Sequence, residues 1–217
     1  AKASPEDILI QVTVANRGPE AATLHLLPTL WFRNDWTWNE DAPRPSLRSE
    51  AGSIVADHAQ LGKRYLYCDA GQQGAPALLF TENETNTQRL WNQPNASPYV
   101  KDGINNFVVQ GEATAVNPAQ EGTKASAYYQ LTVGGGESVV VRLRLTDAAA
   151  SKGSSAFNPF ADFDSVFAER KQEADIFYSS ITPPAIEGKD AAAVMRQALA
   201  GMLWSKQYYF FDLDRWL

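Results

Sequence analysis

The sequence predicts a mainly β fold, in which an antiparallel β-sandwich is followed by two C-terminal helices. Three observations lead to this class. Short segments such as "ILIQVTV" at residues 8–14 alternate apolar and polar side chains, as half-buried strands do. Stretches rich in glycine, proline and small polar residues separate these segments. After Asp147 the apolar residues recur every three or four positions instead, which is typical of amphipathic helices.

The alternating segments predict a series of strands joined by turns. Residues 8–32 predict a β-hairpin that turns at Gly18-Pro19, and residues 124–147 predict a second hairpin that turns at "GGGE". Further strands are expected at "YLYCDA", "ALLFTE" and "NFVVQGEA". Residues 33–50 and 82–106 lack a sustained period and are predicted to be long ordered loops, which in compact domains are more often functional than accidental.

The last third of the chain predicts a linker and two helices. Small and polar residues over 148–159 suit a linker, and the apolar spacing over 160–181 predicts a helix that ends at "TPP". A second helix begins near Asp190 and carries an apolar stripe over 194–203. The expected division is therefore a β-sandwich domain at 1–147, a linker with one helix at 148–189, and a further helix at 190–217.

Composition argues against several classes of function. The formal net charge of -6, without a cluster of Lys and Arg, argues against nucleic acid as the partner. No apolar run approaches the ~20 residues of a membrane span, so no membrane contact is expected. The single cysteine, Cys68, excludes an internal disulfide and suits a reducing, cytoplasmic compartment. His25 and His58 lie in separate segments, so no metal site is predicted, and no motif for a cofactor is present.

Paired carboxylates are the first catalytic candidates, since glycoside hydrolysis needs one carboxyl as acid and another as base or nucleophile. The pairs separated by one residue are Glu82 with Glu84, Asp162 with Asp164, and Asp212 with Asp214. This spacing does not reliably place two carboxyls on opposite sides of one bond. Asp162 and Asp164 flank a predicted helix start and are better explained as caps, and Glu82 and Glu84 as solvated loop residues. No catalytic residue is assigned.

Two clusters that mix aromatic and polar residues are better candidates for a binding site. The first is "WFRNDWTW", which contains Trp31, Arg33, Asn34, Asp35, Trp36 and Trp38. The second contains Trp204, Lys206, Gln207, Tyr208 and Asp212. Sugar sites combine aromatic faces with charged or amide groups in this way. Packing is the alternative for both clusters. The tryptophans of the first cluster then pin a long loop onto the sandwich, and the aromatic residues of the second cluster pack between helices.

Four long blocks of the sequence resemble bacterial proteins related to glycoside hydrolase family 63. The blocks are "NRGPEAATLHLLPTLWFRNDWTW", "LLFTENETNTQRLWNQPNASPYVKDGINN", "NPAQEGTKASAYYQLTV" and "MRQALAGMLWSKQYYFFDLDRWL". The resemblance extends over essentially the whole chain. The family includes processing α-glucosidase and enzymes that hydrolyse mannosyl- or glucosylglycerate.

The resemblance implies an N-terminal antiparallel β-super-sandwich, a helical linker, and a C-terminal (α/α)6 domain that holds the active site. Residues 1–147 are then the greater part of the super-sandwich without its N-terminal portion, and residues 190–217 are the first helix of the (α/α)6 domain. Members of the family invert configuration with an Asp as acid and a Glu as base, both in that domain. The chain is therefore expected to stop before either catalytic carboxylate.

The resemblance also nominates residues for substrate binding. The block that opens the (α/α)6 domain matches here at Trp204, Lys206, Gln207, Tyr208 and Asp212. Sandwich loops reach the catalytic cleft in such enzymes, and they correspond here to the Trp-rich loop and to residues 82–106. The nominated residues of these two loops are Arg33, Asn34, Trp36, Lys101 and Asp102.

Three hypotheses about function follow. In the first, the chain is a non-catalytic wall of a sugar cleft, which packs on the (α/α)6 domain of the same protein and contacts an oligosaccharide or glycoside. In the second, it is an independent carbohydrate-binding module that uses Trp31, Trp36, Trp38 or Trp91. In the third, it is a structural or oligomerisation domain. The apolar stripe over 194–203 also predicts self-association where its partner is missing.

Overall fold

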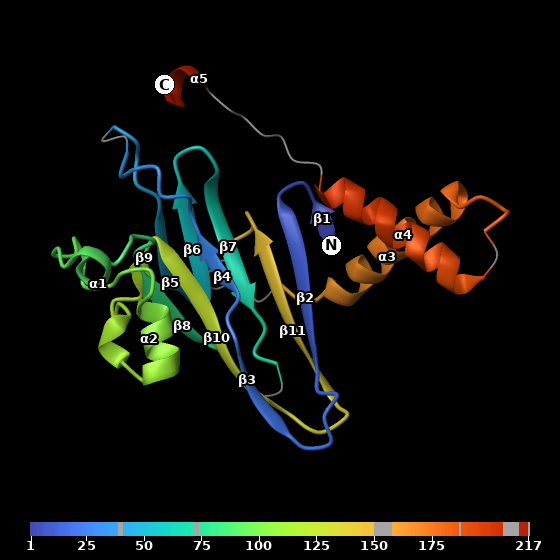
Figure 1. The fold of residues 1–217 in the computed structure, drawn as a ribbon, viewed down its shortest axis with the longest axis horizontal. Coiled ribbons are helices and arrows are strands. Elements are labelled where there is room, and N and C mark those ends of the chain that lie inside the picture. Colours follow the sequence, from blue (N-terminus) through green and yellow to red (C-terminus); the bar gives the residue numbers. More distant parts are fainter. Residues whose placement is uncertain (39–40, 72–73, 150–157, 187, 206–212, 217) are drawn as a thin grey trace. The chain divides into compact units, whose positions relative to one another are not determined.

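Two antiparallel sheets form the β-rich part of the computed structural model (Figure 1). The structure describes residues 1–38, 41–71, 74–149, 158–186, 188–205 and 213–216. The larger sheet contains, in order, β1 (Lys2–Ser4), β2 (Asp7–Ala15), β11 (Ser138–Thr146), β7 (Gly62–Cys68), β6 (Ser53–His58), β5 (Ser46–Glu50) and β9 (Glu121–Gly122). The smaller sheet contains β3 (Ala22–Leu26), β4 (Thr29–Trp31), β8 (Ala77–Thr81) and the central β10 (Lys124–Val133).

The two sheets share one hydrophobic core. Successive side chains of a strand point to opposite faces, so β10 directs Ala125, Ala127 and Tyr129 to the core while the residues between them face outward. Phe80 of β8 and Leu47 of β5 are fully buried in the same core. Both belong to a compact unit that spans Ala1–Val166, and a second compact unit spans Phe167–Leu217. Sheets that pack in this way form a sandwich, although helices also contribute, so the fold is mixed rather than purely β.

Both predicted hairpins are wrong, although their strands are present. β2 lies in the larger sheet and β3 in the smaller one, and β11 and β10 are divided between the sheets in the same way. Each turn therefore carries the chain across the core rather than back along one sheet. Alternation identifies the apolar face of a strand, but it does not tell whether the next strand pairs beside that face or packs opposite it.

The two turns that cross between the sheets contact each other. Asn16 donates its backbone N–H to Glu137 O at 2.9 Å, and Gly136 donates to Asn16 O at 3.0 Å. A side chain at Gly135 would place its Cβ 2.3 Å from Pro19 O. The glycines of "GGGE" therefore allow the close approach of two turns, rather than closing a hairpin.

The segment "NFVVQGEA" belongs mainly to a helix, not to the predicted strand. Helix α2 spans Gly103–Gln110 and ends at Gly111, whose φ of 72° suits a left-handed C-cap. Ile104 and Val108 lie one helical turn apart and pack with Leu79 against the outer face of the smaller sheet. Figure 1 shows α2, in green, beside β8 and β10. An apolar run this short suits either structure, and packing on the sheet decides for the helix.

The predicted long loops contain regular structure. The last part of the loop expected at 33–50 is strand β5, which pairs with β6 through the turn at Ala51-Gly52, where both residues have positive φ. The loop expected at 82–106 contains the short helix α1 (Thr87–Trp91) and the start of α2. A 3-10 turn, η1, spans Ala113–Ala115.

Two C-terminal helices are present as predicted, although the second, expected over 190–217, is described as a helix only to Ser205. They are α3 (Phe163–Ile181) and α4 (Lys189–Ser205), and the short α5 (Leu213–Trp216) follows. Asp162 and Asp164, which the sequence explains as caps, form ion pairs with Arg144 and Arg142 of β11, at 2.5 Å and 2.9 Å. In the described part of the chain, every helix is too short or too polar to cross a lipid bilayer.

Candidate functional site

Two loops of the first unit meet at one end of the smaller sheet. β4 leads into residues 32–45, and β8 leads into residues 82–102. Both strands pair with β10 at the same position, because Lys124 lies opposite Trp31 on one edge and opposite Thr81 on the other. The register of three strands thus brings together two segments that lie far apart in the sequence. We call residues 32–38, 41–45 and 82–102 the loop cluster.

Reciprocal amide hydrogen bonds join the two halves of the loop cluster. Asn34 donates from Nδ2 to Asn83 O at 2.9 Å, and Asn83 donates from Nδ2 to Phe32 O at 2.8 Å. Asn83 also donates its backbone N–H to Thr123 Oγ1 at 2.8 Å. The nominated residue Asn34 therefore positions the loop, and its buried Oδ1 has no hydrogen-bond partner within the described chain. The amide of the sequon at Asn83 is likewise engaged in a contact between the loops.

Glu82 and Glu84 are not free loop residues, contrary to the sequence-based interpretation. Arg44 Nη2 lies 2.8 Å from Glu82 Oε2 and 3.1 Å from Glu84 Oε1. Glu82 Oε2 also accepts a hydrogen bond of 2.7 Å from the hydroxyl of Thr123, which is almost fully buried. Two carboxylates thus share one guanidinium and tie residues 41–45 to the second loop. Both side chains are therefore engaged in contacts within the loop cluster, rather than placed on opposite sides of an open cleft.

The nominated Lys101 and Asp102 lie at the end of the second loop. Asp102 accepts hydrogen bonds from Asn86 Nδ2, at 3.2 Å to each carboxylate oxygen, and from Arg89 Nη1 at 3.1 Å. Lys101 donates from Nζ to Thr85 Oγ1 at 3.0 Å. Asp102 precedes α2 but makes no side-chain cap to it. Its carboxylate instead holds α1 and the start of α2 together.

The tryptophans of the loop cluster and of the adjoining strand differ in exposure. Trp38 is 72% exposed and Trp31 is 55% exposed. Arg33 lies over the ring of Trp38, with its guanidinium carbon 5.6 Å from the ring centroid. Trp36 is half-buried, and its Nε1 is buried without a hydrogen-bond partner in the described chain. Trp91 at the end of α1 is 61% exposed. The first predicted cluster thus presents aromatic faces to solvent, with Trp36 as the residue that anchors the loop.

The second predicted cluster is described only in part. Trp204 lies near the C-terminal end of α4 in the second compact unit, and its side chain is 88% exposed. The other nominated residues of this cluster, Lys206, Gln207, Tyr208 and Asp212, lie outside the described residues.

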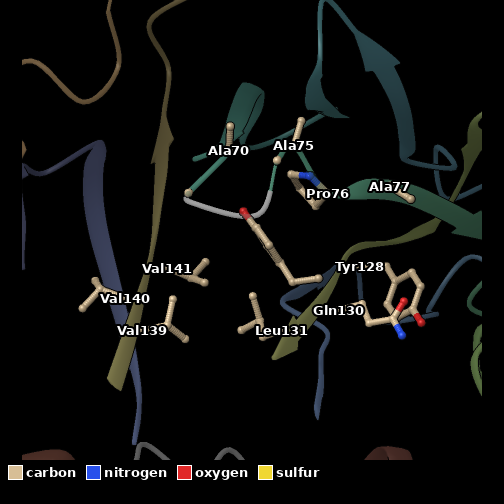
Figure 2. Close-up of a pocket in the computed structure, with 13 residues that line it drawn as sticks. Ala70, Ala75, Pro76, Ala77, Tyr128, Gln130, Leu131, Val139, Val140 and Val141 are labelled. Atoms are coloured by element: carbon tan, nitrogen blue, oxygen red, sulfur yellow. The ribbon is translucent and has the colours of Figure 1, made fainter. Parts of the chain in front are cut away.

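Two pockets lie in the first unit. One, of about 270 Å³, adjoins the loop cluster and is lined by Arg44–Arg48, Glu82, Asn117 and Glu121–Thr123. The other, of about 300 Å³, lies between β10 and β11 and is shown in Figure 2. Val139 and Val141 point into it and Val140 points away. The wall of this second pocket is both polar and apolar, and it contains none of the nominated residues. No sequence signal marked it.

Cys68 is not a candidate nucleophile. Burial raises the pKa of its thiol to about 12, and a hydrogen bond with Tyr129 opposes this effect only in part. The thiol is therefore protonated at neutral pH, whereas the thiolate is the reactive form. In the described part of the chain, no three His, Cys, Asp or Glu side chains come close enough together to hold a metal ion.

Comparison with known proteins gives one informative similarity. No protein-family model matches this sequence. The chain is similar to YMR196W, an uncharacterized protein of Saccharomyces cerevisiae, with 33% identity over 242 residues. The similarity covers 98% of this chain but 22% of the yeast protein. The chain thus spans about a fifth of the length of this relative.

Proposed function

We propose that this chain is the non-catalytic part of an inverting α-glycoside hydrolase related to family 63. In this proposal the loop cluster forms one wall of the sugar cleft, and the helices of the second unit lead into a catalytic (α/α)6 domain. We also expect the protein to act in the cytoplasm. The observation that carries the proposal is the loop cluster itself, where solvent-exposed indole rings stand beside polar side chains that are held in place by hydrogen bonds.

The chemistry of the loop cluster supports contact with a sugar. The exposed ring of Trp38 offers a flat apolar face of the kind that packs against the C–H face of a pyranose. Arg33 lies over one face of that ring, and its guanidinium adds donors for hydroxyl groups. The link between Asn34 and Asn83 fixes the loop before a ligand arrives, which lowers the entropic cost of binding.

The state of the carboxylates supports a non-catalytic role. Glu82 and Glu84 share Arg44, while Asp162 and Asp164 are bound to arginines of β11. An inverting mechanism needs one protonated and one ionised carboxyl about 6.5–9.5 Å apart across the scissile bond. The described pairs fit that requirement poorly, in agreement with an acid and a base that the (α/α)6 domain supplies.

The second unit supports a helical partner. Val194, Met202 and Leu203 on α4 expose more than half of their side-chain surface. An exposed apolar surface of this kind usually marks an interface. A following helical domain of the same protein is the partner we propose, and the much greater length of the yeast relative leaves room for one. Self-association through α4 is the expected behaviour when that domain is missing.

An independent carbohydrate-binding module is the second candidate. The exposure of Trp31, Trp38 and Trp91 favours it over a purely structural domain, in which these rings would be buried. The two candidates differ in what the isolated chain does. A module binds neutral oligosaccharides tightly by itself, whereas a cleft wall binds them tightly only with the rest of the enzyme.

The test compares the chain of residues 1–217 with the full-length protein. Oligosaccharide binding is measured by calorimetry and hydrolysis by release of an aryl α-glucoside. We expect activity only in the full-length protein, where Trp38→Ala raises KM about tenfold with a small change in kcat. Val140→Ala, on the outer face of the larger sheet, is the matched control and leaves KM unchanged. Hydrolysis by the isolated chain at an enzymatic rate contradicts the proposal, and tight binding by it supports the module instead.

A further inference from the structure

Two lysines and a tryptophan meet on the outer face of the smaller sheet. Lys124 of β10 lies directly opposite Trp31 of β4. Their neighbours Ala125 and Leu30 pack in the core, so Lys124 and Trp31 point to the other face of the sheet. Opposed residues of an antiparallel pair have Cβ atoms about 5 Å apart, so the two side chains start from neighbouring positions on that face.

Hydrogen bonds bring Lys101 to the same place. Lys124 donates from Nζ to Lys101 O at 2.8 Å, which puts its ammonium group on the backbone of the second lysine. Lys101 donates its backbone N–H to Glu84 O at 3.0 Å, and its Nζ donates to Thr85 Oγ1 at 3.0 Å. An ammonium group has three donors, so these bonds leave each lysine with two donors for a ligand.

The carboxylates around the two ammonium groups form ion pairs with arginines instead. Asp102 forms an ion pair with Arg89, and Glu82 and Glu84 both form ion pairs with Arg44. Within the described chain, neither Lys101 nor Lys124 has a carboxylate oxygen within ion-pair distance.

The pKa of Lys124 reflects this arrangement. Burial lowers it first, the charge of Lys101 lowers it further, and the charge of Asp102 acts in the opposite direction. Two like charges held near each other attract an anion, because the anion relieves their mutual repulsion.

The donors suit a tetrahedral oxyanion better than a planar carboxylate. Lysine acts as a point charge that binds phosphate oxygens from many directions, whereas arginine provides the planar fork that matches a carboxylate. The exposed ring of Trp31 beside the ammonium groups suits the apolar face of a sugar. We propose that Trp31, Lys101 and Lys124 form a subsite for a sugar that carries a phosphate ester. This inference rests on the proposed function, in which this end of the sandwich faces a carbohydrate.

The experiment measures binding of three probes to the chain of residues 1–217 by amide-shift titration at one ionic strength. The probes are glucose 6-phosphate, inorganic phosphate and glucose. We expect glucose 6-phosphate to bind about tenfold more tightly than either of the others, because it uses both the ring and the ammonium groups. Lys101→Met and Lys124→Met each weaken that binding about tenfold. Trp31→Leu reduces the affinity for glucose 6-phosphate to that for inorganic phosphate.

Lys63→Met is the matched control, because Lys63 is an exposed lysine of β7, on the other sheet, and leaves all affinities unchanged. Lys101 is exposed, so Lys101→Met is expected to keep its fold even if Lys124→Met does not. The amide spectrum reports whether each variant is folded. Equal binding of glucose and glucose 6-phosphate overturns the subsite but leaves the sugar cleft intact. Equal binding of phosphate and glucose 6-phosphate, insensitive to Trp31→Leu, overturns the sugar part of the inference. No shift with any probe overturns the subsite as a whole, and the KM of the Trp38 variant then still tests the proposed function separately.

Discussion

The two compact units of this chain are stabilised in different ways. The first has a core in which Phe80, Leu47 and Ile54 have no exposed surface. In the second unit, no residue whose burial is described is buried, and Val194, Met202 and Leu203 of α4 are well exposed. The sandwich therefore carries its own hydrophobic core, whereas α4 leaves several apolar side chains exposed.

Phe80→Ala is expected to have the largest effect on stability. Phe80 is the largest of the fully buried side chains in the core that both sheets share, and its truncation leaves a cavity that rigid strands cannot close. We expect a loss of about 4 kcal/mol in the free energy of unfolding, measured by urea titration with circular dichroism. Val194→Ala in the second unit is the matched aliphatic truncation and costs less than about 0.5 kcal/mol. A similar loss in both variants would remove the distinction between the units.

Arg144→Met tests how the segment before the helices is held to the sandwich. Arg144 is buried, and it donates from Nη2 to Asp7 at 2.6 Å and from Nη1 to Asp162 at 2.5 Å and to Pro159 O at 2.8 Å. Its removal leaves the largely buried carboxylate of Asp7 without a counter-charge. The expected loss is about 3 kcal/mol in the free energy of unfolding.

Arg142→Met is the control for that prediction, because Arg142 is bound to a carboxylate that is mostly exposed, that of Asp164. An exposed pair contributes less than about 1 kcal/mol. Amide hydrogen exchange supplies a second measurement. In Arg144→Met the amides over 163–166 exchange faster while those of β10 stay protected. Uniform loss of protection would mean that Arg144 stabilises the whole sandwich and not this segment.

The sequence predicted most of the strands and both long helices, because alternation and helical spacing are local properties. It did not predict which strands pair. "ILIQVTV" and "SVVVRLRLTD" were each assigned to hairpins with their neighbours in sequence, but they are β2 and β11 and pair with each other. Pairing depends on how whole sheets pack, and one strand does not contain that information. The same reason explains "NFVVQGEA", which becomes part of α2 because Leu79 of the sheet offers it an apolar surface.

The candidate site was predicted in its residue types but not in its contacts. At 31–38 the sequence allowed either tryptophans that face a ligand or tryptophans that pin the loop onto the sandwich. Trp31 and Trp38 are exposed there, and Trp36 is half-buried. The link from Asn34 to Asn83 joins residues 49 positions apart, and the pair of Arg44 with Glu84 joins residues 40 positions apart. Such contacts follow from the register of β4, β8 and β10. The sequence therefore predicted solvated carboxylates at Glu82 and Glu84, although the two share Arg44.

The pH dependence of stability is the smallest expected effect and concerns Asp162, near the end of the first unit. The hydrogen bond from Arg144 lowers the pKa of Asp162 below its ordinary value of 3.8, its Coulomb attraction adds to this, and burial opposes it. Because the pKa in the folded state is lowered, the stabilisation is complete above pH 3.8 and is lost as pH falls through the folded value. Asp162 is half exposed, so the effect is less than about 1 kcal/mol.

Urea midpoints between pH 2 and pH 7 measure this contribution. We expect the midpoint of the parent chain to fall more steeply below pH 4 than that of Asp162→Asn, because the amide has no proton to gain. Asp164→Asn, which changes the more exposed carboxylate of the neighbouring pair, is the matched control for the substitution itself. An identical slope in the parent and in Asp162→Asn would show that acid does not act through this contact. The residues around the start of α3 would then be held mainly by the hydrogen bond from Arg144 to Pro159 O and by the burial of Phe163.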